Sequence, residues 1–331
     1  MLFNPHDFWI RATAVHDEVT FNECALELFR YQSEQVTVYK EFLRLLKKDA
    51  SSIKHYSEIP FLPVSLFKNK IVADQKSTPD FYFTSSGTTG QITSRHYLAD
   101  RKIYDDSLLK CFTHFYGDPG QYCFLALLPS YLERSGSSLV YMMEHLIREG
   151  GHPLSGFFLH NHQELASRIK ILTDRGEKNF LLGVTYALLD FFEKYPMQLS
   201  NAIVMETGGM KGRRKELVKS EVHQLLSAGT GLKHIHSEYG MTELLSQSYS
   251  PGEGVFNCPP WMKIIVGDLH DPFSLAATNE TGNIKVIDLA NIHSCAFIET
   301  QDLGRIKIDN SFEVLGRMDN SELRGCNLMA M

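Results

Sequence analysis

Between residues 100 and 237 the sequence alternates amphipathic stretches with short apolar runs, and this alternation limits the possible fold more than any other feature. Apolar residues at helical spacing predict helices, whereas short apolar runs predict buried strands. The predicted helices span residues 100–115, 136–149, 163–172, 186–194 and 211–226, and the predicted strands span residues 121–128, 154–158, 179–182, 202–205 and 234–237. This alternation favours an α/β fold with a mostly parallel sheet that helices cover.

The segments on either side of this core have different sequence patterns. Apolar residues recur at helical spacing up to about residue 50, and Pro60 and Pro63 then predict an extended connection. Short β-like runs follow Gly252 and predict a smaller antiparallel unit, at residues 263–266, 283–288, 295–299, 305–308 and 312–315. We therefore expect a helical N-terminal cap and connection (1–75), an α/β core (76–250), and a β-rich subdomain with a short tail (251–331).

Composition and charge argue against several classes of function. The 331 residues carry a net charge of −6 without a basic tract, which disfavours binding to nucleic acid through its phosphates. No apolar run approaches the roughly 18 residues of a membrane span, and the N-terminus lacks a basic-then-apolar signal pattern. The six cysteines show neither C-x-x-C pairs nor a zinc spacing, so reduced thiols are the simplest interpretation. We expect a soluble cytoplasmic protein.

An apolar run at residues 81–83 predicts a buried strand that leads directly into TSSGTTG, residues 84–90. Gly87 and Gly90 can adopt positive φ and let the backbone approach a ligand. Hydroxyl groups and backbone N–H groups of such a loop suit a polyphosphate, and the hydroxyls come from Thr84, Ser85, Ser86, Thr88 and Thr89. The loop lacks the lysine and the spacing of a Walker A motif. Taken alone, a cluster of this kind is more often a plain surface turn.

A second chemically rich segment is YGMTE, residues 239–243. It combines a ring that can stack on a base, a glycine, a hydroxyl for phosphate and a carboxylate for Mg²⁺. Taken singly, Tyr239 is more often a core residue and Glu243 a solvated helix residue. Ligands of open α/β sheets bind at the carboxyl ends of the strands, where we expect this segment and TGGMK, residues 207–211. A fourth segment, TQDLGR (300–305), is expected to follow a strand of the smaller unit.

The order of these motifs resembles the adenylate-forming superfamily, which includes acyl-CoA ligases and the adenylation domains of peptide synthetases. The matching motifs are TSSGTTG (84–90), GG (208–209), YGMTE (239–243), TQDLGR (300–305) and GRMDNSELRG (316–325). They extend over about three quarters of the chain. The resemblance implies the N-terminal domain of an adenylate-forming enzyme, with helix-covered, mostly parallel sheets and a smaller antiparallel β unit. It also implies that the small C-terminal domain of the ligases is missing.

Four longer stretches are similar to the bacterial acyl-protein synthetase family, the synthetase of the fatty-acid reductase complex that makes aldehyde for luminescence. They are IPFLPVSLFK (59–68), LLPSYLERSGSSLVYMM (127–143), HSEYGMTELLSQ (236–247) and DNSELRGCNLM (319–329). This similarity implies a partner, either an acyl reductase or another acyl acceptor. The acid that it implies is a fatty acid.

The resemblance implies a role for each motif residue in binding ATP and Mg²⁺. The residues expected to hold the β- and γ-phosphates are Ser85, Ser86, Gly87, Thr88, Thr89 and Gly90. Gly208 and Gly209 are expected to lie along the adenine and Tyr239 to stack on it, and Gly240 is expected to belong to the same nucleotide-binding set. Thr242 is expected to contact the α-phosphate, and Glu243 to bind Mg²⁺. Asp302 is expected to bind the ribose hydroxyls, and Arg317 the ribose or a phosphate.

The sequence departs from the superfamily at three places. Gln91 stands where a lysine usually follows the phosphate loop, and Gln301 replaces the glycine of T-G-D. The chain is also expected to lack the lysine that the C-terminal domain supplies in the adenylation step. Arg134, Lys211 and Lys68 are candidates to replace it, and none is favoured.

The implied reaction joins a carboxylic acid to AMP and then transfers the acyl group to a thiol. In the acyl-protein synthetases the acceptor is a cysteine near the C-terminus, which here is Cys326. The neighbouring Arg324 is expected to lower the pKa of this thiol. The plain alternative is an inert thiol at a frayed terminus. Two other functions stay open: an acyl-CoA ligase that uses free coenzyme A, and a subunit that binds a nucleotide or acyl-adenylate without turnover.

Overall fold

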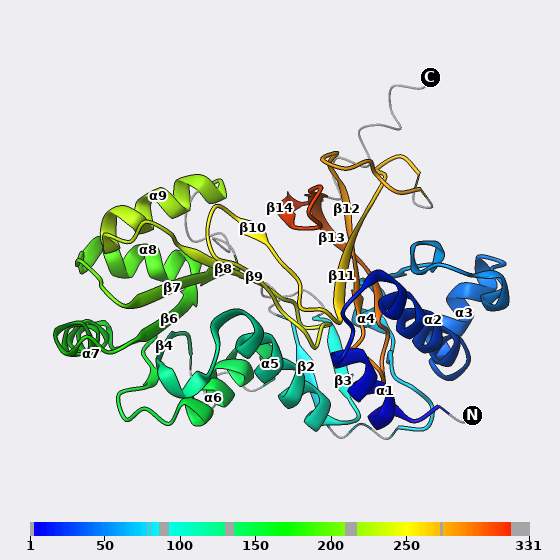
Figure 1. Ribbon diagram of the computed structural model, residues 1–331, viewed down its shortest axis with the longest axis horizontal. Coiled ribbons are helices and arrows are strands. Elements are labelled where there is room, and N and C mark those ends of the chain that lie inside the picture. The colour runs from blue at the N-terminus through cyan, green and yellow to red at the C-terminus, as the bar shows by residue number, and fades with distance from the viewer. Residues whose placement is uncertain are drawn as a thin grey trace. The chain divides into compact units, whose positions relative to one another are not determined.

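The computed structural model describes residues 3–77, 79, 81–85, 93–129, 136–208, 217–271 and 274–318. The chain divides into two compact units (Figure 1). One unit is continuous and runs from Asp80 to Pro259. The other joins two distant parts of the chain, Met1–Pro79 and Pro260–Met331.

The continuous unit is built on a mostly parallel sheet with the strand order β5-β4-β6-β7-β8-β9. The strands are β4 (Cys123–Leu127), β5 (Gly156–Phe157), β6 (Asn179–Val184), β7 (Ala202–Thr207), β8 (His236–Tyr239) and β9 (Ser248–Ser250). Only β9 runs antiparallel to its neighbour in this order. Every residue of β4 and β6 is buried, because helices cover both faces of the sheet.

The helices of this unit are α5 (Arg101–Tyr116), α6 (Ser138–Gly150), α7 (His162–Arg175), α8 (Thr185–Lys194) and α9 (Lys219–Thr230), with a 3₁₀ turn η3 at Pro119–Gln121. Figure 1 shows α8 and α9 on one face of the sheet and α5 and α6 on the other. Local sequence sets their ends: Ser137 caps α6, and Gly151 ends that helix at a φ of 61°. The predicted α/β class is confirmed.

Several predicted boundaries were wrong. The helix predicted at 211–226 begins at Lys219, because Val218 is extended, and continues to Thr230, where Gly231 adopts a φ of 73°. Residues 211–216 lie outside the described residues. The last predicted strand extends to Tyr239, because Tyr239 pairs with Ser248 of β9. Tyr239 is therefore a strand residue.

The strand predicted before the hydroxyl loop forms a separate antiparallel hairpin rather than part of the parallel sheet. Strand β2 (Phe81–Thr84) pairs with β3 (Arg95–Leu98), which the sequence did not predict. The run was expected to be buried, yet Tyr82 is 41% exposed while Phe83 is fully buried. Side chains of a strand alternate between two faces, and here only one face is covered. A short strand β10 (Val255–Phe256) completes the unit.

The discontinuous unit joins N-terminal helices to an antiparallel meander. Its helices are α1 (Pro5–Thr13), α2 (Glu18–Gln35), α3 (Thr37–Leu45) and α4 (Leu66–Asn69), with 3₁₀ turns η1 (Ala50–Ser52) and η2 (Tyr56–Glu58). Its strands are β1 (Leu62–Pro63), β11 (Met262–Gly267), β12 (Gly282–Asp288), β13 (Phe297–Ile306) and β14 (Phe312–Arg317). Strands β11 to β14 pair antiparallel in chain order, and β1 pairs parallel to β13.

Two of the predicted runs, 295–299 and 305–308, are joined in the single strand β13. TQDLGR therefore lies within a strand and not after one, which corrects the expectation. Gly304 allows this continuity, because a β carbon at this position would lie 2.4 Å from the Glu313 carbonyl oxygen. The pairing between β13 and β14 shifts register between Leu303 and Gly304. A β-bulge therefore lies within the motif, and the strand continues through it.

Aromatic rings form the core of the discontinuous unit. The Phe297 ring of β13 lies 5.9 Å from the Phe29 ring and 6.2 Å from the Tyr39 ring, measured between centroids. The buried Gln32 side chain donates to the Asn291 carbonyl oxygen and accepts from the Ala296 backbone N–H. These contacts fix the N-terminal helices onto the C-terminal strands. In the described part of the chain, no helix is long and apolar enough to cross a membrane.

Candidate active site

The parallel strands of the continuous unit end at a common edge, and two of the predicted motifs lie there. Gly208 directly follows β7, and Gly240 directly follows β8. Gly208 has a φ of 75°, a conformation that favours glycine and exposes its peptide groups. Strands β7 and β8 are neighbours in the sheet, so these two motifs are close together. The expectation that these two segments lie at the carboxyl ends of strands is confirmed, and the structure adds that the two strands are neighbours.

The base of the hydroxyl loop is closed by two serines. Ser85 N–H donates to the Ser94 carbonyl oxygen at 3.1 Å, and Ser94 N–H donates to Ser85 Oγ at 2.9 Å. Ser85 therefore lies where the β2–β3 hairpin opens into the loop. The other predicted phosphate-binding residues lie outside the described residues: Ser86, Gly87, Thr88, Thr89 and Gly90.

A buried histidine joins this hairpin to the YGMTE segment. His96 Nδ1 donates to the Thr242 carbonyl oxygen at 2.9 Å. His96 belongs to β3, and 146 residues separate it from Thr242 along the chain. The structure thus brings together the two segments that the resemblance assigns to the phosphates of ATP. Sequence analysis missed His96, since no motif includes it.

The start of α6 also contacts the hairpin. Thr84 N–H donates to the Gly136 carbonyl oxygen at 2.7 Å. Gly136 has a φ of 83°, and a β carbon at this position would lie 3.2 Å from Thr84 Oγ1. Both observations favour glycine at residue 136. The base of the hydroxyl loop is therefore held by β3 on one side and by the residues before α6 on the other.

Strands β7 and β8 are joined at their ends by two reciprocal acid–hydroxyl pairs. Glu206 and Thr207 of β7 lie opposite Ser237 and Glu238 of β8 in the register. Ser237 Oγ donates to Glu206 Oε1, and Thr207 Oγ1 donates to Glu238 Oε2 at 2.5 Å. Successive side chains of a strand point to opposite faces. The two pairs therefore lie on opposite faces of the sheet, immediately before Gly208 and Gly240.

Glu206 is the centre of a buried ionic cluster on one face. Its Oε1 accepts from Lys219 Nζ at 2.6 Å, and its Oε2 accepts from Thr185 Oγ1 at 2.7 Å. Burial disfavours the ionised carboxyl, but the hydrogen bond from His223 and the charge and hydrogen bond of Lys219 outweigh it and hold the pKa of Glu206 at about 2. His223 Nε2 lies 3.2 Å from Ser237 Oγ. This is not a nucleophilic triad, because Ser237 is fully buried.

Glu238 on the other face has the opposite electrostatic character. Burial raises the pKa of this carboxyl to about 7, although the Thr207 hydrogen bond opposes the shift. The tyrosines Tyr104, Tyr116 and Tyr249 lie near this carboxyl group. Tyr104 OH donates to the Ser138 carbonyl oxygen, and Tyr116 OH bonds to His236 Nδ1. Burial lowers the pKa of His236 to about 4, so this imidazole is neutral at physiological pH.

The remaining residues of YGMTE are mostly covered. Tyr239 is 8% exposed, and its ring centroid lies 6.1 Å from that of Phe256 in an edge-on arrangement. Glu243 is 4% exposed, and Thr242 is half-buried. Carboxylates are common Mg²⁺ ligands, and the positive-φ Gly208 suits a close ligand, so these residue types fit a Mg²⁺–nucleotide. Their assignment to ATP remains a prediction.

The predicted ribose-binding residues form an ion pair in the discontinuous unit. Asp302 and Arg317 are cross-strand partners of β13 and β14, and Arg317 Nε donates to Asp302 Oδ1 at 3.1 Å. The Asp302 side chain is 13% exposed and that of Arg317 is 78% exposed. The carboxylate is therefore held in place while the guanidinium remains largely in solvent. Their role in binding ribose remains a prediction.

Several other residues discussed from the sequence lie outside the described residues, namely Gln91, Arg134, Gly209, Lys211 and Cys326. Lys68 is in the short helix α4 of the discontinuous unit. The structure therefore favours none of the three candidates, Arg134, Lys211 and Lys68, for the role of that lysine.

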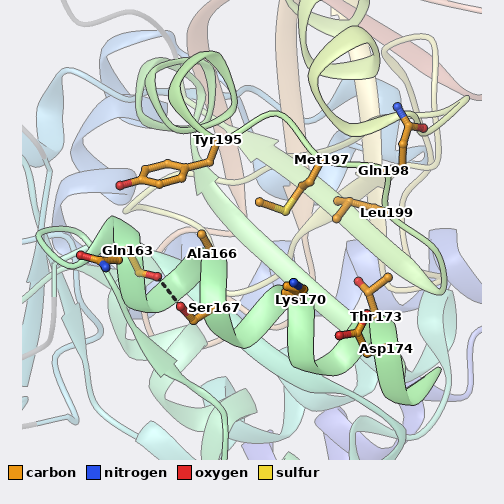
Figure 2. A pocket seen from close by; sticks show the side chains of 10 residues that line it. All are labelled: Gln163, Ala166, Ser167, Lys170, Thr173, Asp174, Tyr195, Met197, Gln198 and Leu199. Atoms are coloured by element: carbon orange, nitrogen blue, oxygen red, sulfur yellow. Dashed lines mark hydrogen bonds between the residues drawn. The ribbon is translucent and has the colours of Figure 1, made fainter.

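A separate pocket of about 420 Å³ lies along α7. Figure 2 shows Tyr195, Met197 and Leu199 on one side of it, with Ala166 and Lys170 of α7 facing them. None of the predicted site residues lines this pocket. It is therefore not part of the candidate active site.

Comparison with protein-family models and with the sequences of curated proteins finds no match. Solved structures do match. ATP-bound MatB from Rhodopseudomonas palustris is 18% identical with a TM-score of 0.54, and the match covers 81% of this chain and 52% of that one. An open 2-hydroxyisobutyryl-CoA ligase in complex with 2-HIB-AMP and CoA is 13% identical with a TM-score of 0.64, covering 92% and 72%.

The chain thus spans about half the length of the MatB structures that it matches. At such low identities the likeness shows the fold alone. The fold predicted from the motifs, that of the N-terminal domain of an adenylate-forming enzyme, is therefore confirmed.

Proposed function

We propose that this chain activates a carboxylic acid with ATP, forming an acyl-adenylate and releasing pyrophosphate. One observation carries the proposal: His96 joins the hairpin of the hydroxyl loop to the YGMTE segment through its 2.9 Å hydrogen bond to Thr242. Two motifs that would have to contact the same triphosphate are therefore held together by a buried contact. The confirmed fold and the order of the motifs support the same reaction.

In this proposed reaction each of the described motif residues has its own role. An oxygen of the acid attacks the α-phosphorus, and the bond from that phosphorus to the pyrophosphate oxygen breaks. The Thr242 hydroxyl contacts the α-phosphate, and Glu243 holds Mg²⁺, which supplies positive charge to the phosphates when bound. Asp302 and Arg317 bind the ribose. Their main effect is to position the reactants, which converts a bimolecular step into an effectively unimolecular one.

The second half of the proposed reaction transfers the acyl group to a thiol. A thiolate attacks the acyl carbon, the bond to AMP breaks, and a thioester forms. The sequence resemblance favours Cys326 as this thiol, a fatty acid as the substrate and an acyl reductase as the partner. Free coenzyme A is the second candidate acceptor, because a structural neighbour is a CoA ligase solved with CoA.

Two measurements test the proposal. The first is ATP–pyrophosphate exchange with a panel of carboxylic acids. We expect exchange that depends on the acid and that Glu243→Ala reduces at least tenfold, whereas unchanged exchange in this variant would contradict the site. The second is the intact mass of the chain after incubation with Mg·ATP and the same acids, beside Cys326→Ser. A hydroxylamine-labile gain that is absent from Cys326→Ser supports self-acylation. A gain in neither protein, with thioester formed on added coenzyme A, supports the free acceptor.

A further inference from the structure

One wall of the pocket along α7 is a single stripe of that helix. Residues three and four apart lie on the same side of a helix. The buried residues of α7, which are Leu165, Ile169 and Leu172, lie on the other side and hold the helix in place. The lining residues that α7 contributes therefore form one continuous stripe, made of Gln163, Ala166, Ser167, Lys170, Thr173 and Asp174.

The opposite wall is the extended segment 195–199, which follows α8. Tyr195, Met197 and Leu199 are half-buried, whereas the residues between them are exposed, as expected for side chains that alternate along an extended chain. Met197 N–H donates to the Gly229 carbonyl oxygen at 2.9 Å, and Leu199 N–H donates to the carbonyl oxygen of Thr230 at 2.8 Å. Both walls are therefore fixed before any ligand binds.

Two opposite charges line this pocket without pairing. Lys170 and Asp174 are four residues apart and exposed, and among the described residues neither forms an ion pair. At the same spacing Asp106 and Lys110 of α5 do pair, at 3.4 Å. The difference agrees with the order of the charges, since an acid that precedes the base is favoured over the reverse. The ammonium and the carboxylate groups of the pocket both stay available to a ligand.

A hydroxyl group next to these charges also lacks a partner. Thr173 Oγ1 is buried, and in the part of the chain that the structure describes no group bonds to it. Thr173 follows Lys170 by three residues and directly precedes Asp174, so the three side chains leave neighbouring positions of α7. An unpaired buried hydroxyl costs the free energy of its desolvation, which a polar atom of a ligand would recover.

The wall across from these polar groups is apolar. Figure 2 shows the side chains of Tyr195, Met197 and Leu199 on the side of the pocket that faces α7. A methionine adapts its shape to an apolar ligand group. The volume of about 420 Å³ lies within the range of small-molecule sites. A fitting ligand therefore combines a compact head that carries both charges with one apolar group.

We propose that this pocket binds a free α-amino acid with an apolar side chain. Its carboxylate pairs with Lys170 and accepts from the Thr173 hydroxyl, and its ammonium group pairs with Asp174. Its side chain packs on Met197 and Leu199. A ligand with a single charge would gain one ion pair and be repelled by the second charge of the pocket. The site is separate from the candidate active site, and the inference does not depend on the proposed reaction.

Isothermal titration calorimetry of the full chain, without ATP, tests the proposal. The ligands are L-leucine, L-methionine and L-phenylalanine, each beside its amide, which lacks the carboxylate, and its N-acetyl form, which lacks the ammonium group. Glycine lacks the apolar group. We expect the preferred amino acid to bind roughly tenfold or more tightly than its amide, its N-acetyl form and glycine. Equal binding of the amide or the N-acetyl form would overturn the proposal, as would the absence of binding at millimolar concentration.

The charge variants Lys170→Met and Asp174→Asn locate the ligand in the chain. Each is expected to weaken binding roughly 5- to 20-fold, a modest effect because both side chains are exposed. The matched controls are Lys110→Met and Asp106→Asn on α5, which should bind as the wild type does. Wild-type affinity in both charge variants would mean that the amino acid binds elsewhere, and the proposal would be wrong.

The variant Thr173→Val separates a contact with the ligand from a role in the fold. Valine keeps the shape of the side chain and removes the unpaired hydroxyl, so Tm of the free chain is expected to stay equal or rise. The same variant should raise Kd for the amino acid roughly 3- to 10-fold. A lower Tm with an unchanged Kd would show that the hydroxyl serves the fold and not a ligand, which contradicts the proposal.

Discussion

Thr207 and Glu238 are direct cross-strand partners, and the Thr207 hydroxyl donates to Glu238 Oε2 across the ends of β7 and β8 at 2.5 Å. This contact fixes the last residues before Gly208 and Gly240 relative to each other. It also provides a hydrogen-bond donor to one of the two oxygens of a carboxyl group that is otherwise buried among tyrosine rings. The stability and the chemistry of this edge therefore depend on the same hydrogen bond.

Replacing Thr207 by valine is expected to destabilise the chain by about 1–3 kcal/mol, because the variant keeps the shape but leaves Glu238 without its donor. Thr207→Ser keeps the hydroxyl and is the matched control. Urea denaturation of both variants checks the prediction. Equal midpoints for the two would show that the hydrogen bond contributes nothing.

The raised pKa of Glu238, about 7 against an ordinary value of 4.5, predicts a pH dependence of stability. Between these two values the folded chain keeps a proton that the unfolded chain has released, so the free energy of unfolding falls as the pH rises. Glu238→Gln cannot titrate. The difference in the free energy of unfolding between the variant and the wild type is therefore expected to shift in favour of the variant by on the order of 2 kcal/mol between about pH 5 and about pH 8. Urea denaturation across this range measures how the free energy of unfolding changes with pH in the wild type and in Glu238→Gln, with Glu164→Gln as control. Equal pH dependence in the wild type and Glu238→Gln would contradict the prediction.

Lys219→Met is expected to destabilise the continuous unit more than the double variant Lys219→Met/Glu206→Gln does. The single variant leaves the buried Glu206 carboxylate without its main counter-charge, whereas the double variant removes both charges. We expect a cost on the order of 2 kcal/mol for the single variant, since the Lys219 side chain is 31% exposed and solvent screens part of the attraction. Thermal melting near neutral pH compares the two proteins. A double variant less stable than the single one would show that the charge of Glu206 is not the cause.

Acid should remove the contribution of the same carboxylate. Its pKa is lowered to about 2, so the stability that Glu206 contributes is fully present above pH 4.5 and is lost as the pH falls towards 2. The wild-type midpoint is therefore expected to fall more steeply than that of the double variant below about pH 4.5. Denaturation at acidic pH checks this difference, and coincident curves would contradict it.

His96→Phe is expected to lower kcat/KM for ATP–pyrophosphate exchange roughly 10- to 100-fold, because the hairpin loses its hydrogen bond to Thr242. His114→Phe, an exposed change on α5, is the matched control and should behave as wild type. Circular dichroism of both variants verifies that the fold is kept. Unchanged exchange in a folded His96→Phe protein would remove the observation on which the proposed function depends.

The parallel sheet could be predicted because each of its strands and helices is marked by a pattern within its own segment of the sequence. β4 and β6 are continuous apolar runs, since both of their faces are covered, and the helices between the strands carry their own end signals, such as Gly151. β3 was missed because it is short and has only one covered face. The single strand β13 was read as two, because Gly304 and the bulge interrupt its apolar pattern.

The candidate site was predictable only where a motif marks it. Gly208 and YGMTE were placed at the correct strand ends. His96 and Thr242 were not associated, because 146 residues separate them and no local pattern connects them. The pairs Glu206–Ser237 and Thr207–Glu238 depend on the register between β7 and β8. That register is set by packing across the whole sheet rather than by either strand alone.

The hydrogen bond between the Ala296 backbone and the Gln32 side chain joins residues 264 positions apart. The entire continuous unit, Asp80 to Pro259, is inserted between them. During synthesis the inserted unit emerges complete and can fold as soon as it leaves the ribosome, since domains generally fold as units. The helices made first lack the strand against which they pack, β13, until it has been translated. The part of the chain that is synthesised first is thus among the last to become native, and the apolar face that it later buries against β13 stays exposed until then.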